Sequence, residues 1–141
     1  MDPKEEIPQA RYLLDTSALI AYLANESGSQ VVARLRTQSA IPFIALSELY
    51  YVTWTRKNRV EADFVYGIVQ SWKLPLLLPD ERVILTAGRF KGQYKLGVAD
   101  SYIAAFAFET PLSLLTKDND FRMVEKELDV QWIGTVGQTT G

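Results

Sequence analysis

The sequence of 141 residues contains no cysteine and no histidine. Without cysteine there is no disulfide, no thiolate nucleophile and no zinc–thiolate site, which fits a reducing compartment. Without histidine, Ser-His-Asp hydrolysis, paired-histidine RNA cleavage and histidine-ligated zinc are excluded. Any catalysis must use carboxylates, hydroxyls, lysine, arginine or tyrosine, and ligand sets made only of oxygen favour hard cations such as Mg²⁺ or Mn²⁺.

Long apolar runs and a strong charge bias are also missing. No stretch reaches the length that spans a membrane, and the net charge is only −2 with 23% charged residues. We therefore expect no membrane partner, a cytoplasmic location, and nucleic-acid binding only through local basic patches. The polar residues 1–10 are typical of a flexible lead-in and not of a signal peptide. Residues 11–134 are long enough for one domain, and residues 135–141 are expected to form a loose tail.

Five short apolar runs predict strands, and segments with helical composition lie between them. The strands are expected at 12–14, 41–45, 74–78, 112–116 and 130–133. Helices are expected at 17–24, 29–37, 47–55 with Ser47 as N-cap, 61–72, 81–94, 99–108 and 123–127. This alternation predicts an α/β fold in which helices cover both faces of a parallel sheet. Pro75 and Pro79 indicate that the third strand lies at a sheet edge.

Four carboxylates occur in separate, mostly apolar segments, and three of them follow predicted strands. Asp15 comes directly after the first strand, Glu48 shortly after the second and Asp118 just after the fourth. The carboxyl ends of parallel strands share one edge, where open α/β sheets form their sites. Asp100 is followed at helical spacing by Ile103 and other small apolar residues, which indicates an inward-facing side chain. The pattern predicts that the four carboxylates converge.

Each acid also has an ordinary structural interpretation when it is considered alone. Asp15 could cap a strand-to-helix turn, and Glu48 could interact favourably with the helix macrodipole behind the Ser47 cap. Asp100 could be an acid of a first helical turn or an N-cap, and Asp118 could be a solvated acid in a turn-rich segment. The hypothesis of a shared site therefore depends on the joint pattern.

Four segments together resemble the PIN domain and, within it, the VapC type of toxin. These segments are DTSALIAYL at 15–23, ALSELYY at 45–51, VADSYIAAFA at 98–107 and LLTKDNDF at 114–121. The resemblance runs from about Arg11 to Gly134. It implies a three-layer α/β/α domain with a central parallel five-stranded sheet in the order 3-2-1-4-5.

The resemblance also implies an activity, a cofactor and partners. It implies an endoribonuclease that depends on Mg²⁺ or Mn²⁺, forms a homodimer and is neutralised by a small VapB-type antitoxin. Asp15, Glu48, Asp100 and Asp118 match the acidic positions of the family. The metal ligands are expected to be Asp15, Asp100 and Asp118, and Glu48 is expected to orient or deprotonate the attacking water.

Further positions in the same segments match the family pattern less specifically. The hydroxyls of Thr16, Ser17 and Thr116 match positions near the site. Asp118 is preferred over Asp120 because it follows Thr116 at the T-x-D spacing. Asp120 is expected to stabilise the turn or to support the site from outside the direct ligands.

RNA would need cations near the acidic site. The clearest basic cluster is Arg56, Lys57 and Arg59, interpreted as phosphate contacts, although solvated helix faces give the same pattern. Three alternatives remain open: an RNA-processing nuclease without an antitoxin, a catalytically silent nucleic-acid-binding scaffold, and a phosphatase or phosphoacceptor domain with Asp15 as nucleophile. Haloacid-dehalogenase-like phosphatases have a second Asp two residues after the first, where this sequence has Ser17.

Overall fold

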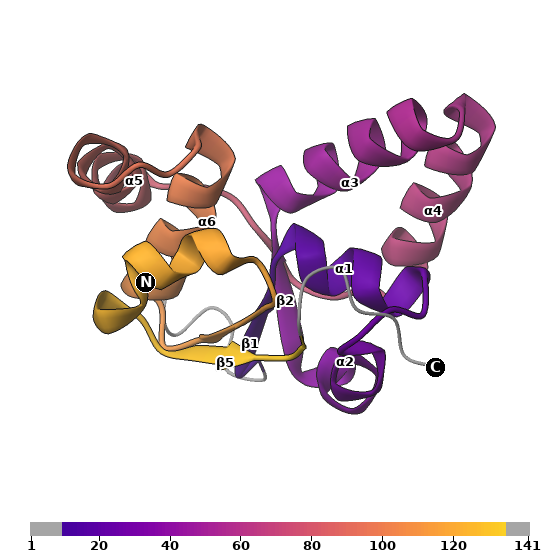
Figure 1. Ribbon diagram of the computed structural model, residues 1–141, viewed down its shortest axis with the longest axis horizontal. Coiled ribbons are helices and arrows are strands. Elements are labelled where there is room, and N and C mark those ends of the chain that lie inside the picture. The colour runs from indigo at the N-terminus through magenta and orange to yellow at the C-terminus, as the bar shows by residue number, and fades with distance from the viewer. Residues whose placement is uncertain (1–9, 135–141) are drawn as a thin grey trace.

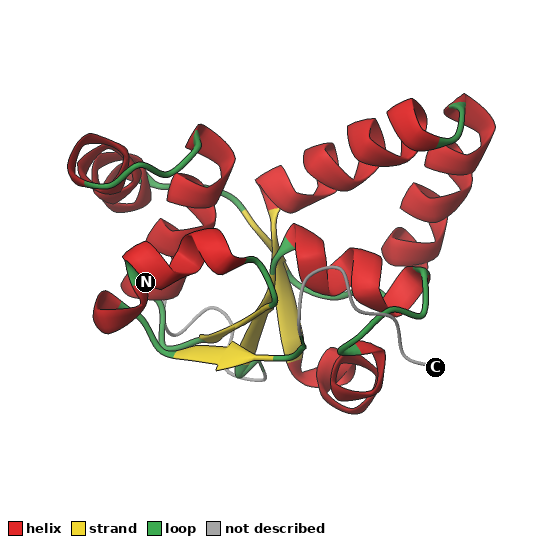
Figure 2. Cartoon of the chain, viewed as in Figure 1, coloured by secondary structure: helices red, strands yellow, loops and turns green. Residues whose placement is uncertain are grey.

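The computed structural model describes residues 10–134, and its centre is a parallel sheet of five short strands (Figure 2). The strands are β1 (Tyr12–Leu14), β2 (Ser39–Pro42), β3 (Leu76–Leu77), β4 (Ser113–Thr116) and β5 (Val130–Trp132). Their order is β3-β2-β1-β4-β5, and every pair is parallel. The predicted order 3-2-1-4-5 is confirmed, and so is the edge position of the third strand.

Within residues 10–134, six α-helices surround this sheet (Figure 1). They are α1 (Thr16–Leu23), α2 (Ser29–Leu35), α3 (Phe43–Arg56), α4 (Arg59–Ser71), α5 (Glu81–Gln93) and α6 (Val98–Glu109). Helices α5 and α6 pack on one face, whereas α1, α2 and the first turns of α3 pack on the other. The predicted three-layer α/β/α architecture is therefore confirmed.

The central strands divide their side chains between two hydrophobic cores. Leu13 and Leu114 point into the core beneath α5 and α6. Leu14 and Leu115 point into the core beneath α1 and α2. Successive side chains of a strand alternate between the faces of a sheet, so apolar residues at consecutive positions are what a sheet covered on both sides requires.

The boundary between β2 and α3 differs from the sequence-based prediction of a strand at 41–45 followed by a helix capped by Ser47. The strand ends at Pro42, which is the N-cap residue of α3, and the helix already begins at Phe43. Ser47 is therefore an exposed residue inside the helix. An apolar run of this length fits a strand or a buried helix equally well, and the core contacts of Ala45 and Leu46 stabilise the helix here.

Smaller differences concern the segment after β4. In place of one helix at 123–127 there are two 3₁₀ helices, η3 (Asn119–Met123) and η4 (Glu125–Glu127). Another 3₁₀ turn, η2 (Arg36–Gln38), extends α2 towards β2.

The predicted lead-in, apart from residue 10, and the predicted tail at 135–141 lie outside the described residues. Between residues 10 and 134, no helix combines the length and apolarity needed to cross a bilayer.

Candidate metal centre

Asp15 lies at the carboxyl end of β1, the central strand, and is also the N-cap of α1. Its Oδ1 accepts the backbone N–H of Ala18 at 2.8 Å and the Ser17 hydroxyl at 2.7 Å. The Thr116 hydroxyl donates to the other carboxylate oxygen. The side chain is buried, with 2% exposure. The bond from Ala18 caps α1. The bonds from the Ser17 and Thr116 hydroxyls hold the Asp15 carboxylate in a single orientation.

The same hydroxyls connect Asp15 to the segment that carries Asp118. Thr116, the last residue of β4, accepts the backbone N–H of Asp118 at 3.0 Å. Ser17 Oγ lies 3.3 Å from Thr116 Oγ1 and accepts the backbone N–H of Lys117 at 3.1 Å. Because β1 and β4 are neighbours in the sheet, these short side chains join the two strand ends directly.

Glu48 lies in the second turn of α3, and its Oε1 accepts the Thr16 hydroxyl at 2.6 Å. This position is beyond the first turn, where the helix macrodipole acts most strongly. The interpretation of Glu48 as a macrodipole partner behind a Ser47 cap is therefore wrong. The bond from Thr16 instead ties the Glu48 side chain to the residue that follows Asp15.

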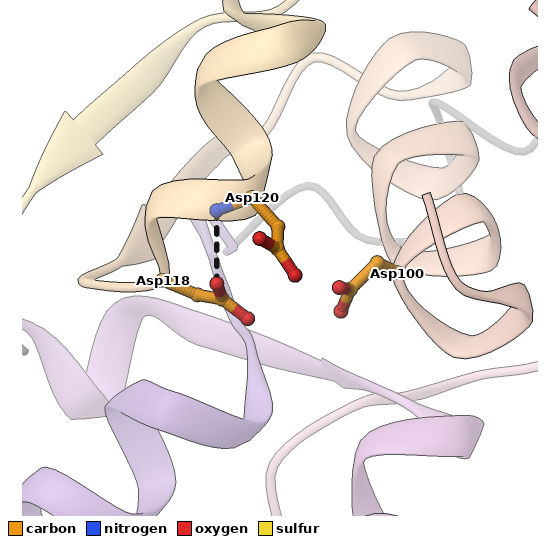
Figure 3. A group of neighbouring side chains, drawn as sticks. All are labelled: Asp100, Asp118 and Asp120. Carbon is orange, nitrogen blue, oxygen red and sulfur yellow. Dashed lines mark hydrogen bonds between the residues drawn. The ribbon is translucent and has the colours of Figure 1, made fainter. Parts of the chain in front are cut away.

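Asp100, Asp118 and Asp120 form a compact acidic cluster (Figure 3). Each contributes one oxygen atom, and these atoms lie within 4.8 Å of one another. Asp100 comes from the first turn of α6, as predicted, with Gly97 as the N-cap. Asp118 is the N-cap of η3 and accepts the backbone N–H of Asp120 at 2.9 Å. This tight turn brings the Asp120 carboxylate towards Asp100.

Burial and mutual repulsion oppose the ionisation of these acids. Burial, followed by the charges of Asp118, Glu48, Asp15 and Asp120, raises the pKa of Asp100 to about 7. All four of these charged groups therefore lie close enough to Asp100 to act on it. Asp100, Asp118 and Asp120 thus lie within ligand distance of one another, whereas Asp15 and Glu48 lie outside that cluster and act on Asp100 through their charges.

The pKa values of Asp15 and Asp118 are also raised, and in both cases hydrogen bonds oppose the rise. Burial raises the pKa of Asp15 to about 6, although the hydrogen bonds from Thr116, Ser17 and Ala18 oppose this rise. Burial also raises the pKa of Asp118, against the hydrogen bond from the backbone of Asp120. A bound cation would relieve both the desolvation and the repulsion.

The donor set fits a hard divalent cation. Three carboxylates within ligand distance of one another provide only oxygen atoms, as Mg²⁺ and Mn²⁺ prefer. A carboxylate has about four lone-pair positions, and three on Asp15 already accept hydrogen bonds. Asp15 therefore retains about one position for a cation or its water. Asp100, Asp118 and Asp120 are less engaged and form the more open part of the site.

Lys117 is a buried residue of this region that the sequence reasoning missed. Its side chain is 6% exposed, and Nζ donates to Glu26 Oε1 at 3.0 Å and to the carbonyl of Ser27 at 3.2 Å. It anchors the turn between Thr116 and Asp118 to the loop between α1 and α2. A single lysine in a polar segment resembles an ordinary solvated cation, so the sequence gives no signal for its burial.

The predicted RNA-binding cations lie farther along α3. Arg56 ends that helix, Lys57 follows it and Arg59 begins α4, and all three are exposed. With a rise of about 1.5 Å per residue, Arg56 is roughly 12 Å along the helix from Glu48. The cations therefore stand beside the acidic site and not within it.

An acidic, oxygen-only cluster at the switch point of a parallel sheet defines the class of protein: an α/β/α domain whose carboxylates are placed where they could hold a cation. The family model described as "PIN domain" matches residues 12–127. The chain therefore belongs to the PIN domain family.

Solved structures support the same fold. The DNA-bound VapBC of Salmonella typhimurium is 21% identical, with 86% of this chain and 97% of that chain covered and a TM-score of 0.72. A toxin–antitoxin complex from Klebsiella pneumoniae is 19% identical, with coverage of 89% and 99% and a TM-score of 0.68. VapBC-5 of Mycobacterium tuberculosis is 22% identical, with coverage of 89% and 99% and a TM-score of 0.65. No curated protein matches the chain.

Proposed function

We propose that this chain is a VapC-type endoribonuclease that hydrolyses RNA phosphodiester bonds with Mg²⁺ or Mn²⁺. The observation that carries the proposal is the cluster of Asp100, Asp118 and Asp120, whose carboxylate oxygens lie within 4.8 Å of one another. Burial and the charges of the surrounding acids raise the pKa of Asp100 to about 7. Such strongly perturbed carboxylates are typical of functional sites. Family membership and the likeness to toxin–antitoxin proteins favour a nuclease.

Asp100 and Asp118 would hold the cation together with Asp15, and Asp120 is placed to contribute as well. When bound, a divalent cation supplies neutralisation of phosphoryl charge and activation of water. The hydroxyls of Ser17 and Thr116 keep the Asp15 carboxylate fixed, so little side-chain entropy remains to be lost when the site is loaded.

Glu48 is the proposed general base. Its carboxylate acts on Asp100 electrostatically and is oriented by the Thr16 hydroxyl at 2.6 Å. One carboxylate oxygen is thereby held by the protein, and the other is left to accept a proton from the attacking water. The water oxygen then forms the new bond to phosphorus as the bond to the leaving ribose oxygen breaks.

The alternative in which Asp15 is a phosphoacceptor is disfavoured by its surroundings. A nucleophilic carboxylate must present a free oxygen to the phosphoryl group, whereas Asp15 is 2% exposed and accepts three hydrogen bonds. A catalytically silent scaffold has no need for costly, mutually repelling carboxylates. A nuclease without an antitoxin remains the second candidate, because it would use the same site.

The proposed partners are RNA, a second copy of the chain and a VapB-type antitoxin. The solved relatives are described as toxin–antitoxin complexes or VapBC pairs. A groove of about 450 Å³ between α1, α3 and α4 offers a surface for an antitoxin segment. It is lined by apolar residues such as Leu23 and Leu49 and by charged residues that include Arg56, Lys57 and Glu61. A short open reading frame immediately upstream, encoding a DNA-binding start and an amphipathic tail, would support the antitoxin.

Cleavage of purified RNA tests the activity. We expect the protein to cut structured RNAs with Mn²⁺ and not with EDTA, and Asp100→Asn to lower the rate by about a thousand-fold or more. Asp129→Asn, at an exposed position outside the acidic cluster, is the matched control and should retain the activity. Cleavage that survived Asp100→Asn would reject the proposed site.

A further inference from the structure

Lys117 is a buried lysine that lies between two residues of the acidic site. Thr116 before it and Asp118 after it both take part in that site. In extended backbone, successive side chains point to opposite sides, and the Lys117 side chain accordingly runs to the loop between α1 and α2. There its Nζ donates to Glu26 Oε1 at 3.0 Å and to the carbonyl oxygen of Ser27 at 3.2 Å.

Burying a lysine is costly, and stability alone does not explain this one. The Lys117 side chain is 6% exposed, and the carboxylate of Glu26 compensates its charge. Replacing such an ion pair by apolar residues of similar volume is often neutral or even stabilising. A pair of this kind is therefore better explained by the register that it sets between the two segments it joins.

The loop between α1 and α2 is itself firmly held. The backbone N–H of Glu26 donates to the carbonyl of Ala21 at 2.8 Å, and the Glu26 carbonyl accepts from Ser29 at 3.0 Å. At Gly28, φ is +95°, and a Cβ added there would lie 2.8 Å from the carbonyl oxygen of Ile133. The loop thus packs closely against the chain that follows β5, and it offers Lys117 a fixed point of attachment.

The restraint on Lys117 passes to two acids of the cluster. The backbone N–H of Lys117 donates to Ser17 Oγ at 3.1 Å, so backbone and side chain are both held. Asp118 is the next residue, and it accepts the backbone N–H of Asp120 at 2.9 Å. Figure 3 shows these two acids on one turn, opposite Asp100 of α6. The position of the turn therefore sets the distance between the two sides of the cluster.

We propose that Lys117 is a positioning residue that, through its ion pair with Glu26, holds Asp118 and Asp120 where they can share a divalent cation with Asp100. This inference rests on the proposed function, because it assigns a support to the metal site on which that function depends. The positive charge itself does not favour metal binding, since an ammonium group repels a nearby cation. The contribution of Lys117 is its reach and its hydrogen bonds.

Mn²⁺ titration by calorimetry, at a temperature where the chain is fully folded, tests the proposal. Lys117→Met keeps roughly the length and volume of the side chain and removes the tether. We expect it to weaken Mn²⁺ binding by about ten-fold or more, the usual cost of losing a residue that supports metal ligands. Removal of a positive charge without any movement of the acids would instead tighten Mn²⁺ binding. The sign of the change therefore separates positioning from electrostatics.

A double variant removes the tether without changing the net charge. Lys117→Met with Glu26→Leu replaces the pair by apolar side chains, an exchange that such pairs often tolerate. It should match the native chain in urea unfolding with EDTA, yet bind Mn²⁺ about as weakly as Lys117→Met alone. Glu26→Gln keeps an oxygen acceptor for the Lys117 Nζ and should therefore lose less affinity than either of these variants.

The matched control is Asp80→Asn with Arg82→Gln. It removes an exposed ion pair near the start of α5 and also leaves the net charge unchanged. This control should bind Mn²⁺ as the native chain does. Asp118→Asn provides the reference for the loss of a proposed ligand.

Three results would overturn the proposal while Asp118→Asn still weakens Mn²⁺ binding. They are native or tighter Mn²⁺ binding in the double variant, a loss no larger than that in the control pair, and a double variant that does not fold. The last result would assign the ion pair to stability. If the native chain also cleaves RNA with Mn²⁺, each of these results rejects the role of Lys117 alone. If the native chain binds no Mn²⁺, or Asp118→Asn binds it unchanged, the proposed metal site fails together with this inference.

Discussion

The two halves of the acidic site are built differently. Asp15 is buried and receives three hydrogen bonds from the protein. Asp100, on the opposite side, is partly exposed and faces other carboxylates that repel it. The first half is balanced by hydrogen bonds from the protein, whereas the second carries repelling charges that a bound cation would balance. From this difference we predict which substitutions change the stability of the metal-free protein and which change metal binding.

The open half should respond most strongly to added metal. We expect Mn²⁺ at about one hundred times its dissociation constant to stabilise the native chain by about 2.7 kcal/mol. For a domain of this size that corresponds to a rise in Tm of roughly 10 °C. The double variant Asp15→Asn with Asp100→Asn should show almost no rise. Thermal melts with Mn²⁺ and with EDTA measure the effect.

The control for this comparison is Asp80→Asn with Asp129→Asn, which removes the same charge from positions outside the acidic cluster. That variant should keep the full response to Mn²⁺, even though Asp80 caps α5 and its loss lowers the starting Tm. An equal response in both double variants would show that the ion binds elsewhere.

The buried half should make the metal-free protein less stable as pH rises. The native pKa of Asp15, about 6, lies above its ordinary value of 3.8, so the native state holds this proton more tightly than the unfolded state. The resulting stabilisation is complete below about pH 4 and is lost as pH rises through 6. Between pH 4.5 and 7.5 the loss from Asp15 is about 2 kcal/mol.

Urea unfolding of the native chain and of Asp15→Asn in EDTA isolates this contribution. The asparagine oxygen still accepts from Ser17 and Ala18, and its amide can donate to Thr116, so the geometry is preserved. Carboxylates outside the acidic site titrate equally in both proteins and cancel in the difference, whereas Asp100 adds a smaller difference because the Asp15 charge helps to raise its pKa. Parallel pH profiles for the two proteins would contradict the assigned cause of the shift.

The positions of Asp15 and Asp118 could be predicted because strands identify them. Each directly follows a short apolar run, and parallel topology brings the ends of β1 and β4 to the same edge. The inward orientation of Asp100 could be predicted from helical periodicity alone. Short apolar runs therefore predict most strands of the sheet, and the distance of each acid from these runs or within a helix predicts its position.

Tertiary packing decides the features that the sequence did not reveal. The sequence pattern predicts a start of α3 that is too late, because Phe43 to Ala45 satisfies both strand and helix patterns and only contacts in the core favour the helix. The approach of Asp120 to Asp100 depends on a 3₁₀ turn in which Asp118 binds the backbone of Asp120. The burial of Lys117 depends on Glu26, a residue distant in the sequence.

The smallest expected effect concerns Thr16, which lies between the two halves. Its hydroxyl donates to Glu48 and has no role in the Asp15 network. Thr16→Val keeps the shape and removes this donor, so Glu48 loses its fixed orientation without losing its charge. A hydrogen bond to a charged group contributes about 1.5 kcal/mol or more, which predicts a decrease in kcat of roughly ten-fold with KM unchanged.

Thr16→Ser is the decisive partner of this variant, because it restores the hydroxyl while removing a methyl group. If the hydroxyl orients Glu48, Thr16→Ser retains nearly the full kcat and Thr16→Val does not. If instead the methyl group matters through packing, the order of the two variants reverses and only Thr16→Ser loses stability in urea. An equal Mn²⁺-induced rise in Tm in both variants would place the defect in the action of Glu48 on water, leaving the two carboxylate halves of the site intact.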